Sequence, residues 1–301
     1  MKLHTYLLFL FFSLLFVFYP GDSLYFSTFA FNRQLLSKGT SPTNLHTLPI
    51  PVVKNQLINP DLTAEGAYIV DAPSFTPVYE RNSKSEFFPA STTKIVTALV
   101  AADVFDLDKV VIIRRAVSEG QTMGLVVGEK ITVENLLYGT LVHSGNDAAY
   151  ALADAYGYDG FVNLMNKKAE SLHMTHTHFK NPAGLDNVEQ ITTPFDLALA
   201  ARELLKNKLL SKIVSTRDIT VSDNDFIYFH RLSNVNKLLG EVHGIGGLKT
   251  GYTESAGENL VSLYKKNDHE FIIVILRSKD RFADTKAAVK WIDENVDYSV
   301  L

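Results

Sequence analysis

Strand-like and helix-like segments occur in separate blocks from residue 64 onwards, and this order constrains the fold more than any other feature. Two short apolar or alternating runs, residues 67–72 and 76–80, flank a Pro-Ser turn. Three similar runs lie near the C-terminus, at residues 243–252, 258–264 and 270–277. Helical patterns fill the region between these blocks. This order predicts a mixed α/β layer with an inserted helical lobe, and a cleft at the lobe boundary.

The expected helices have helical periodicity or recognisable capping residues. One of them begins with Thr193 as an N-cap candidate, Pro194 at the first helical position and Asp196 in the first turn. The segments are residues 92–105, 133–143, 147–155, 161–173, 195–206 and 282–294.

The composition is that of a globular protein. The chain has 301 residues, of which 46% are hydrophobic and 21% charged, and this excludes an intrinsically disordered protein. The 29 Lys and Arg against 33 Asp and Glu give a net charge of −4, which argues against a nucleic-acid-binding protein. The absence of cysteine excludes disulfides, thiolate zinc sites, iron–sulfur clusters and cysteine nucleophiles, and it fits an exported protein.

The N-terminus has the pattern of a secretory signal peptide. Lys2 precedes an apolar run at residues 6–19, which a Pro-Gly-Asp-Ser stretch ends. A helix of this length reaches about 21 Å, short of the roughly 30 Å hydrocarbon core of a bilayer. We expect residues 1–30 to be a signal peptide or an N-terminal membrane anchor, and residues 31–63 a flexible spacer rich in Ser, Thr, Asn and Pro. The protein is then secreted or anchored on the extracytoplasmic side, in a periplasm or on the outer face of the cytoplasmic membrane.

Ser91 and Lys94 form the first candidate site. They lie three residues apart at the start of an expected helix, so the hydroxyl and the amine share one face. The positive end of the helix dipole and burial against the following apolar residues both lower a lysine pKa, as an amine needs in order to serve as general base for serine. In isolation the same pattern is typical of an N-cap serine followed by a surface lysine.

Two further patterns place polar side chains in a loop and on a strand. Ser144 and Asn146 lie between two expected helices, where a hydroxyl and an amide can face one space. Lys249 and Thr250 point to opposite faces of a regular strand unless a bulge re-aims them. The adjacent Gly251 allows another backbone, such as a substrate strand, to approach. The glycines of a phosphate loop are missing from this stretch.

Taken together, S-x-x-K, S-x-N and K-T-G in this order match the motifs of penicillin-binding proteins and class A β-lactamases. The chain resembles the low-molecular-weight D-alanyl-D-alanine carboxypeptidases over residues 64–295, the whole catalytic domain of that family. The segments that carry the resemblance are residues 87–94, 144–149, 165–169, 179–185 and 247–253.

The resemblance implies the fold. We expect a β-lactamase-like or DD-peptidase-like α/β protein with an antiparallel sheet of about five strands, flanked by helices, and an inserted helical lobe. It also implies a single catalytic domain at residues 64–301. The α/β lobe is expected at about residues 64–100 and 240–301, and the helical lobe at about residues 101–239.

The resemblance also implies the catalytic residues. Ser91 is expected to attack the carbonyl of the penultimate D-alanine while Lys94 takes its proton, and Ser144 to relay a proton to the leaving D-alanine. Water then hydrolyses the acyl-enzyme, and no metal or organic cofactor is expected. Penicillins and other β-lactams are expected to be mistaken for the substrate and to trap Ser91.

The substrate-binding residues follow from the same resemblance. Asn146 is expected to hold a backbone amide of the stem peptide, and Lys249 and Thr250 to bind its terminal carboxylate. Gly251 belongs to the same strand segment. The backbone N–H of Tyr252, with that of the nucleophile, is expected to form the oxyanion hole.

Four histidines resemble metal ligands or a catalytic base, but they do not fit this chemistry. His173, His176 and His178 alternate as metal ligands on a strand would, but no carboxylate pair flanks them, and we expect no metal site there. His173 also stands where the family usually has glycine in a Leu-Gly-Met turn. His143 adjoins the second motif, and with a lysine available as base we expect it to have a packing or surface role.

We therefore expect a serine-type D-Ala-D-Ala carboxypeptidase that trims peptidoglycan in cell wall biogenesis and cell shape, with a membrane tether available through residues 6–19. A DD-endopeptidase that cuts cross-links through the same serine stays open, because the local motifs do not separate the two. The complete motif set disfavours a silent D-Ala-D-Ala-binding protein. A β-lactamase is disfavoured because no glutamate matches the position that activates the deacylating water; the candidates are Glu170, Glu189, Glu203 and Glu241.

Overall fold

The computed structural model describes residues 2–18 and 49–299, and the chain divides into two units, residues 1–47 and 48–301. In the first unit, Lys2–Phe18 form the apolar helix α1. Among the described residues, no helix has both the length and the apolar character needed to cross a membrane. The rest of the predicted signal or anchor, and most of the predicted spacer, lie outside the described residues.

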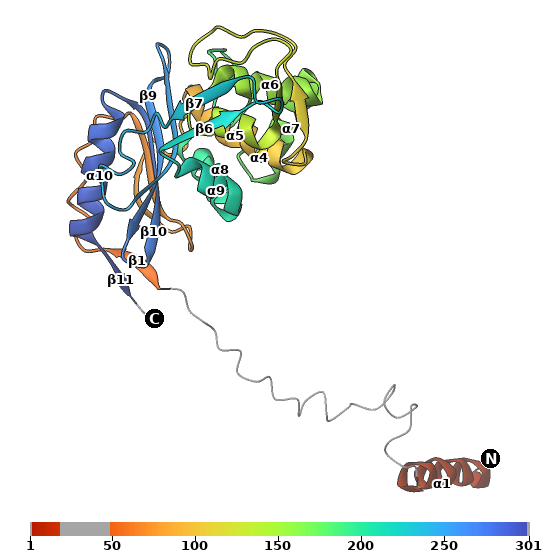
Figure 1. The fold of residues 1–301 in the computed structure, drawn as a ribbon. Helices are drawn as coiled ribbons and strands as arrows, with labels where there is room; N and C mark the ends of the chain where they lie inside the picture. Colours follow the sequence, from red (N-terminus) through yellow and green to blue (C-terminus); the bar gives the residue numbers. More distant parts are fainter. Residues whose placement is uncertain (1, 19–48, 300–301) are drawn as a thin grey trace. The chain divides into compact units, whose positions relative to one another are not determined.

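The second unit is built on a five-stranded sheet of order β3-β2-β10-β9-β8, in which every neighbouring pair is antiparallel (Figure 1). This confirms the predicted sheet. β8 is an edge strand: among the described strands it pairs with β9 alone, so another chain can pair along its other side. The strands are β2 (Gly66–Asp71), β3 (Pro77–Arg81), β8 (Ile245–Thr253), β9 (Gly257–Lys266) and β10 (His269–Ser278).

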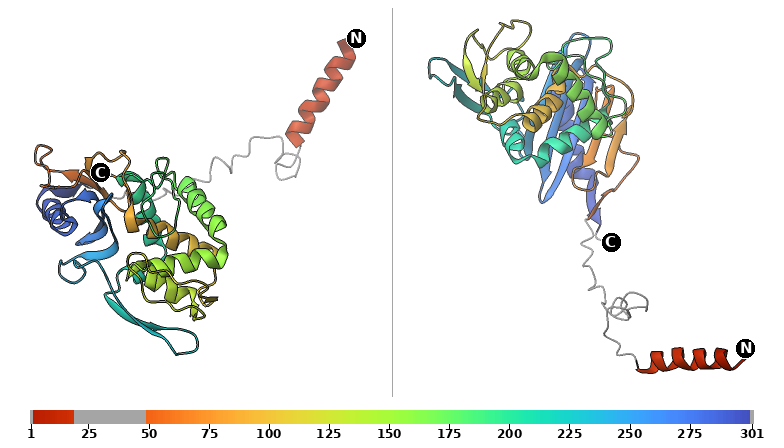
Figure 2. Two further views of the ribbon diagram at one scale, coloured as in Figure 1. Left: turned by 90° about the horizontal axis from the view of Figure 1, so that it is seen from above. Right: turned by 90° about the vertical axis from the view of Figure 1, so that its right-hand side faces the viewer.

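Helices cover both faces of the sheet, because alternate residues of the central strands are apolar on both sides. Ile69 and Ile273 pack in one core with Trp291 of α10 (Arg281–Asn295). Val70 belongs to the larger core on the opposite face, which the helices of the lobe complete. Figures 1 and 2 show α10 alone on its side of the sheet.

The inserted helical lobe is present as predicted. Its α8 begins as the sequence indicates, since the Thr193 hydroxyl accepts from the N–H of Asp196 at 3.0 Å and Pro194 occupies the first turn. The helices on this side of the sheet are α4 (Lys94–Val104), α5 (Val133–Leu141), α6 (Asn146–Tyr156), α7 (Tyr158–Ser171), α8 (Pro194–Lys206) and α9 (Lys208–Val214).

Three small antiparallel strand pairs were not predicted. Each strand has only three to five residues, too few to show a period of two. One pair adds structure to the segment expected to be spacer: β1 (Ile50–Val53) pairs with β11 (Val296–Ser299). The other pairs join β4 (Val110–Ile112) to β5 (Lys130–Thr132), and β6 (Asp218–Ser222) to β7 (Phe229–Ser233).

The C-terminus of α7 explains the unusual His173. The N–H of His173 donates to the carbonyl of Glu170, and that of Met174 to the carbonyl of Ala169, both at 2.9 Å. This is a Schellman cap, in which the residue with left-handed backbone is usually glycine. His173 adopts a φ of 60°. His173 therefore adopts a backbone conformation that favours glycine.

We expect His173→Gly to raise the free energy of unfolding by about 0.5 to 1 kcal/mol. Relief of the left-handed strain contributes about 1 to 2 kcal/mol, and the greater entropy loss of glycine on folding offsets part of it. Urea unfolding followed by circular dichroism measures the change. The control is His176→Gly in the same segment, which relieves no left-handed residue and is expected to lose stability; equal losses in both variants would contradict this account.

Candidate active site

Ser91 lies on a short 3-10 turn, η1 (Ala90–Thr93), which runs directly into α4. The sequence predicts the start of an α-helix at this position instead. The turn is fixed by the Asn259 side chain, which donates to the carbonyl of Pro89 at 3.1 Å. Ala90 is held at a φ of 47°, a strained conformation for a residue with a Cβ. The backbone is thus constrained at the point where the serine is presented.

The side chain of Lys94 is fully buried and contacts Ser91. Its Nζ lies 2.7 Å from the Ser91 Oγ, and equally 2.7 Å from the Oδ1 of Asn146 and the carbonyl oxygen of Ala183. The last two atoms can only accept hydrogen bonds. A neutral amine has two N–H donors, which these acceptors occupy, so its lone pair faces the serine hydroxyl.

The surroundings of Lys94 favour that neutral form. Burial, together with the positive charge of Lys249, lowers the pKa of Lys94 well below its ordinary value, and the carboxylate of Asp147 opposes this only in part. No carboxylate is among the three hydrogen-bond partners of the amine. The geometry is that of a general base beside a nucleophile.

Ser144 and Lys249 form a second contact across the cleft. Ser144 occupies the turn between α5 and α6 at a φ of 61°, and its Oγ accepts from the Nζ of Lys249 at 2.9 Å. Lys249 also donates to the carbonyl of Thr250 at 3.0 Å. Burial, with the nearby positive charge of Arg281, lowers the pKa of Lys249 to about 7. Both partners are buried, with exposed fractions of 5% for Ser144 and 2% for Lys249.

The predicted residues surround one cleft of about 440 Å³. Lys94 and Lys249 are buried behind its wall. A register shift between Ile245 and Leu248 precedes the Lys249-Thr250 pair. The two residues themselves pair regularly with Val261 and Leu260 of β9, so no bulge re-aims one relative to the other. The predicted residues that line the cleft itself are Ser91, Ser144, Asn146, Thr250, Gly251 and Tyr252.

Two residues at the cleft have contacts that the sequence does not predict. Arg281, the first residue of α10, lines the cleft and donates through Nη1 to the carbonyl of Gly251 at 2.8 Å. Its buried Nε has no hydrogen-bond partner among the described residues. Asp147 accepts from the backbone N–H groups of Met123, Gly124 and Leu125 at 2.9 to 3.0 Å, and so ties the loop before β5 to the start of α6. Arg281 belongs to no recognisable local pattern, and Asp147 lies in the segment 144–149 that carries the resemblance but was assigned no role from the sequence.

The other candidates lie elsewhere. Within the described residues there is no group of three His, Cys, Asp or Glu side chains that could hold a metal ion. His143 contacts the side chain of Gln121, at 2.8 Å between the two nitrogens. The glutamates weighed for a β-lactamase do not line the cleft, and three of them form ion pairs with lysines: Glu189, Glu203 and Glu241.

Comparison with known proteins agrees with this geometry. Residues 53–280 match the family model of D-alanyl-D-alanine carboxypeptidases, Peptidase_S11. The carboxypeptidase DacF of Bacillus subtilis is 35% identical over 221 residues, a match that covers 70% of this chain and 57% of that protein. The D-alanyl-D-alanine carboxypeptidase of Streptomyces sp. strain K15 is 32% identical over 239 residues, covering 73% of this chain and 82% of the relative.

Solved structures show the same likeness. The crystal structure of the Streptomyces K15 DD-transpeptidase is 31% identical, with a TM-score of 0.73, and the match covers 78% of this chain and 98% of that one. The D-alanyl-D-alanine carboxypeptidase of Mycobacterium tuberculosis H37Rv is 27% identical, with a TM-score of 0.75, over 83% of this chain and all of its own. Sequence, fold and site geometry therefore lead to one identification: the chain belongs to the D-alanyl-D-alanine carboxypeptidase family of serine peptidases.

Proposed function

We propose that this protein removes the terminal D-alanine from peptidoglycan stem peptides through an acyl-enzyme on Ser91. One observation carries the proposal: a fully buried lysine amine lies 2.7 Å from the hydroxyl of a cleft-lining serine, and its other partners are acceptors only. Such a pair activates serine without histidine or metal. Membership of the carboxypeptidase family supports the same reaction.

Acylation begins when the Ser91 oxygen attacks the carbonyl carbon of the penultimate D-alanine and its proton passes to Lys94. The backbone N–H groups of Ser91 and Tyr252 then stabilise the oxyanion. When the C–N bond breaks, the leaving amine takes a proton through the Ser144 hydroxyl, which Lys249 contacts. Free D-alanine departs, and an ester joins the shortened peptide to Ser91. Water hydrolyses this ester and restores the serine hydroxyl.

The cleft supplies a place for the substrate chain beside β8. Because β8 is an edge strand, an extended peptide can pair with its backbone as an additional strand. The terminal carboxylate then lies toward Thr250 and Arg281, where a hydroxyl and a guanidinium line the cleft. Asn146, on the opposite wall, is placed to hold an amide on the acyl side of the scissile bond.

The same cleft suits β-lactam antibiotics, which would form a long-lived ester with Ser91. We place the reaction outside the cytoplasmic membrane, because peptidoglycan is assembled there and the apolar residues 6–19 provide an export signal or a tether.

The test is release of D-alanine from a peptide that ends in Lys-D-Ala-D-Ala, by the full chain and by Ser91→Ala. We expect release by the parent protein alone, since the variant has no nucleophile. Retained activity in Ser91→Ala would refute the assignment of the nucleophile. If neither protein releases D-alanine, a cross-linked peptide distinguishes a DD-endopeptidase from a silent binding protein.

A further inference from the structure

Glu119 is an acid with no assigned role at the rim of the cleft. It is the one Asp or Glu among the residues that line the cleft. The side chain is exposed, and in the described part of the chain no Lys, Arg or His forms an ion pair with it. A cleft that binds a peptide therefore carries an unpaired negative charge.

The backbone fixes Glu119 beside Asn146. The Nδ2 of Asn146 donates to the carbonyl of Glu119 at 2.8 Å, and the Asn146 N–H donates to the carbonyl of Gln121 at 2.7 Å. Gly120 between them has a φ of 69°, and a Cβ at this position would stand 2.6 Å from the same Nδ2. Residues 119–121 thus form a wall of the cleft that hydrogen bonds hold against Asn146.

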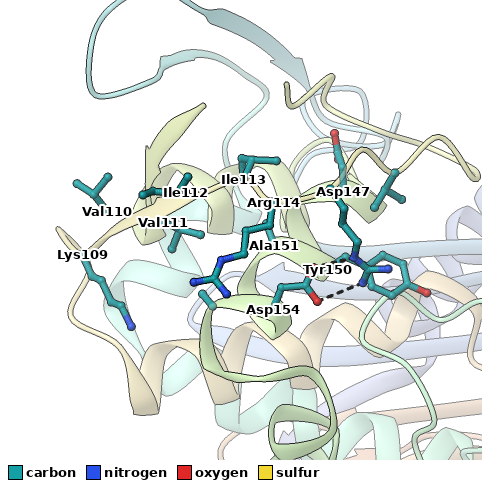
Figure 3. Close-up of a pocket in the computed structure, with 13 residues that line it drawn as sticks. Lys109, Val110, Val111, Ile112, Ile113, Arg114, Asp147, Tyr150, Ala151 and Asp154 are labelled. Atoms are coloured by element: carbon teal, nitrogen blue, oxygen red, sulfur yellow. Dashed lines mark hydrogen bonds and ion pairs between the residues drawn. The ribbon is translucent and has the colours of Figure 1, made fainter. Parts of the chain in front are cut away.

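Asp154, an acid in a neighbouring pocket, already forms an ion pair, and this distinguishes it from Glu119. Figure 3 shows an adjacent pocket in which Asp154 and Tyr150 of α6 lie close together. Asp154 binds Arg115 at 2.7 Å. Burial raises the pKa of Tyr150 to about 12, and the charges of Tyr158 and Glu119 add to this increase, so the Glu119 carboxylate lies within electrostatic reach of that phenol. Of the two acids near Tyr150, Glu119 is the one left to receive a cation.

The orientation of the substrate in the cleft determines which of its side chains lies at residues 119–121. The inference rests on the proposed function: the terminal carboxylate lies at the Thr250 and Arg281 end, and Asn146 holds the amide before the penultimate D-alanine. The residue that precedes D-Ala-D-Ala then lies next to residues 119–121. One end of the cleft is cationic and the other end is anionic, which matches a peptide with a carboxylate at its end and a cation two residues upstream.

We infer that Glu119 binds the side-chain ammonium of the residue that precedes D-Ala-D-Ala, either lysine or another diamino acid. The contact requires this amine to be free. In a cross-linked stem the same amine is part of an amide and carries no charge. Glu119 therefore favours stems whose own side-chain amine has not been used in a cross-link.

The experiment compares two peptides, Nα-acetyl-Lys-D-Ala-D-Ala and its Nε-acetylated form, with D-alanine release as the readout. We expect the full chain to prefer the free amine about fivefold in kcat/KM, the size of a partly exposed ion pair. The preference should disappear in Glu119→Gln and reverse in Glu119→Lys. It should also weaken in about 1 M salt, where the Debye length is near 3 Å.

The matched control is Glu254→Gln, which removes an exposed acid just beyond the end of β8 that does not line the cleft. It should keep the preference of the parent protein. Equal rates on both peptides by the parent would overturn the role of Glu119 and leave the carboxypeptidase intact. A preference that persists in both Glu119 variants would also overturn it. No release from either peptide would instead refute the proposed function. A third peptide with diaminopimelate separates lysine from the other diamino acid.

Discussion

Lys94→Ala is expected to slow acylation of Ser91 by about 10³-fold or more while the fold remains intact. A positioned general base contributes about 10² to 10⁴ to a rate, and no second base contacts the Ser91 hydroxyl among the described residues. The variant leaves no unpaired charge, because the partners of the amine are neutral oxygens. Stopped-flow acylation by a chromogenic β-lactam measures the rate, and circular dichroism checks the fold.

Two companion variants make this result specific. Lys94→Met keeps the length of the buried side chain without the amine, and it should lose as much activity as Lys94→Ala. Lys167→Ala removes an exposed lysine of α7 and should acylate at the rate of the parent protein. Acylation at an unchanged rate in both Lys94 variants would rule out Lys94 as the base.

The pH dependence of acylation is a second test of Lys94 as the general base. A lysine accepts a proton only when neutral, so the rate rises with pH through the pKa of Lys94 and is constant above it. Burial and the charge of Lys249 depress that pKa well below 10.5, so the plateau should begin at correspondingly lower pH. A rate that continued to rise up to pH 10.5 would indicate an ordinary, solvated lysine.

The sequence predicts a contact in this site where the two residues are also close together in the chain. Ser91 and Lys94 lie one helical turn apart, so their contact follows from local geometry alone. Lys249 and Ser144 are 105 residues apart, and the sequence relates them only through the resemblance to a family. Arg281 enters the cleft from the start of α10, one residue before the predicted helix at residues 282–294, and no pattern in the sequence marks it.

The elements of the fold also differ in how well the sequence predicts them. The core strands β2, β9 and β10 and the helix α8 carry strong patterns of apolar residues or caps, and they lie within one or two residues of the predicted bounds. The strand pairs outside the main sheet are set by tertiary contacts, as when Pro51 of β1 pairs with Tyr298. Residues 119–121 belong to no regular element, and their position becomes apparent only through their hydrogen bonds to Asn146.

The close approach of two backbones behind Ser91 gives the second large effect. Gly184 has a φ of 86°, and a Cβ on it would stand 1.9 Å from the carbonyl oxygen of Ala90 and 3.0 Å from the backbone nitrogen of Ser91. These are backbone atoms that no rotamer change can move away. Gly184→Ala must therefore displace the turn that carries Ser91, and a shift of about 1 Å in a reacting group can slow a reaction by about 10²-fold.

Gly124→Ala separates this clash from the backbone strain that both substitutions share. Gly124 has a φ of 88°, and a Cβ there meets nothing within 4 Å. Each alanine carries a left-handed penalty of about 1 to 2 kcal/mol, so urea unfolding should show a loss of that order in Gly124→Ala and a larger loss in Gly184→Ala. Acylation should slow about 10²-fold in Gly184→Ala alone. Equal rates in the two variants would mean that the turn absorbs the added methyl group, and that Gly184 serves stability and not the placement of Ser91.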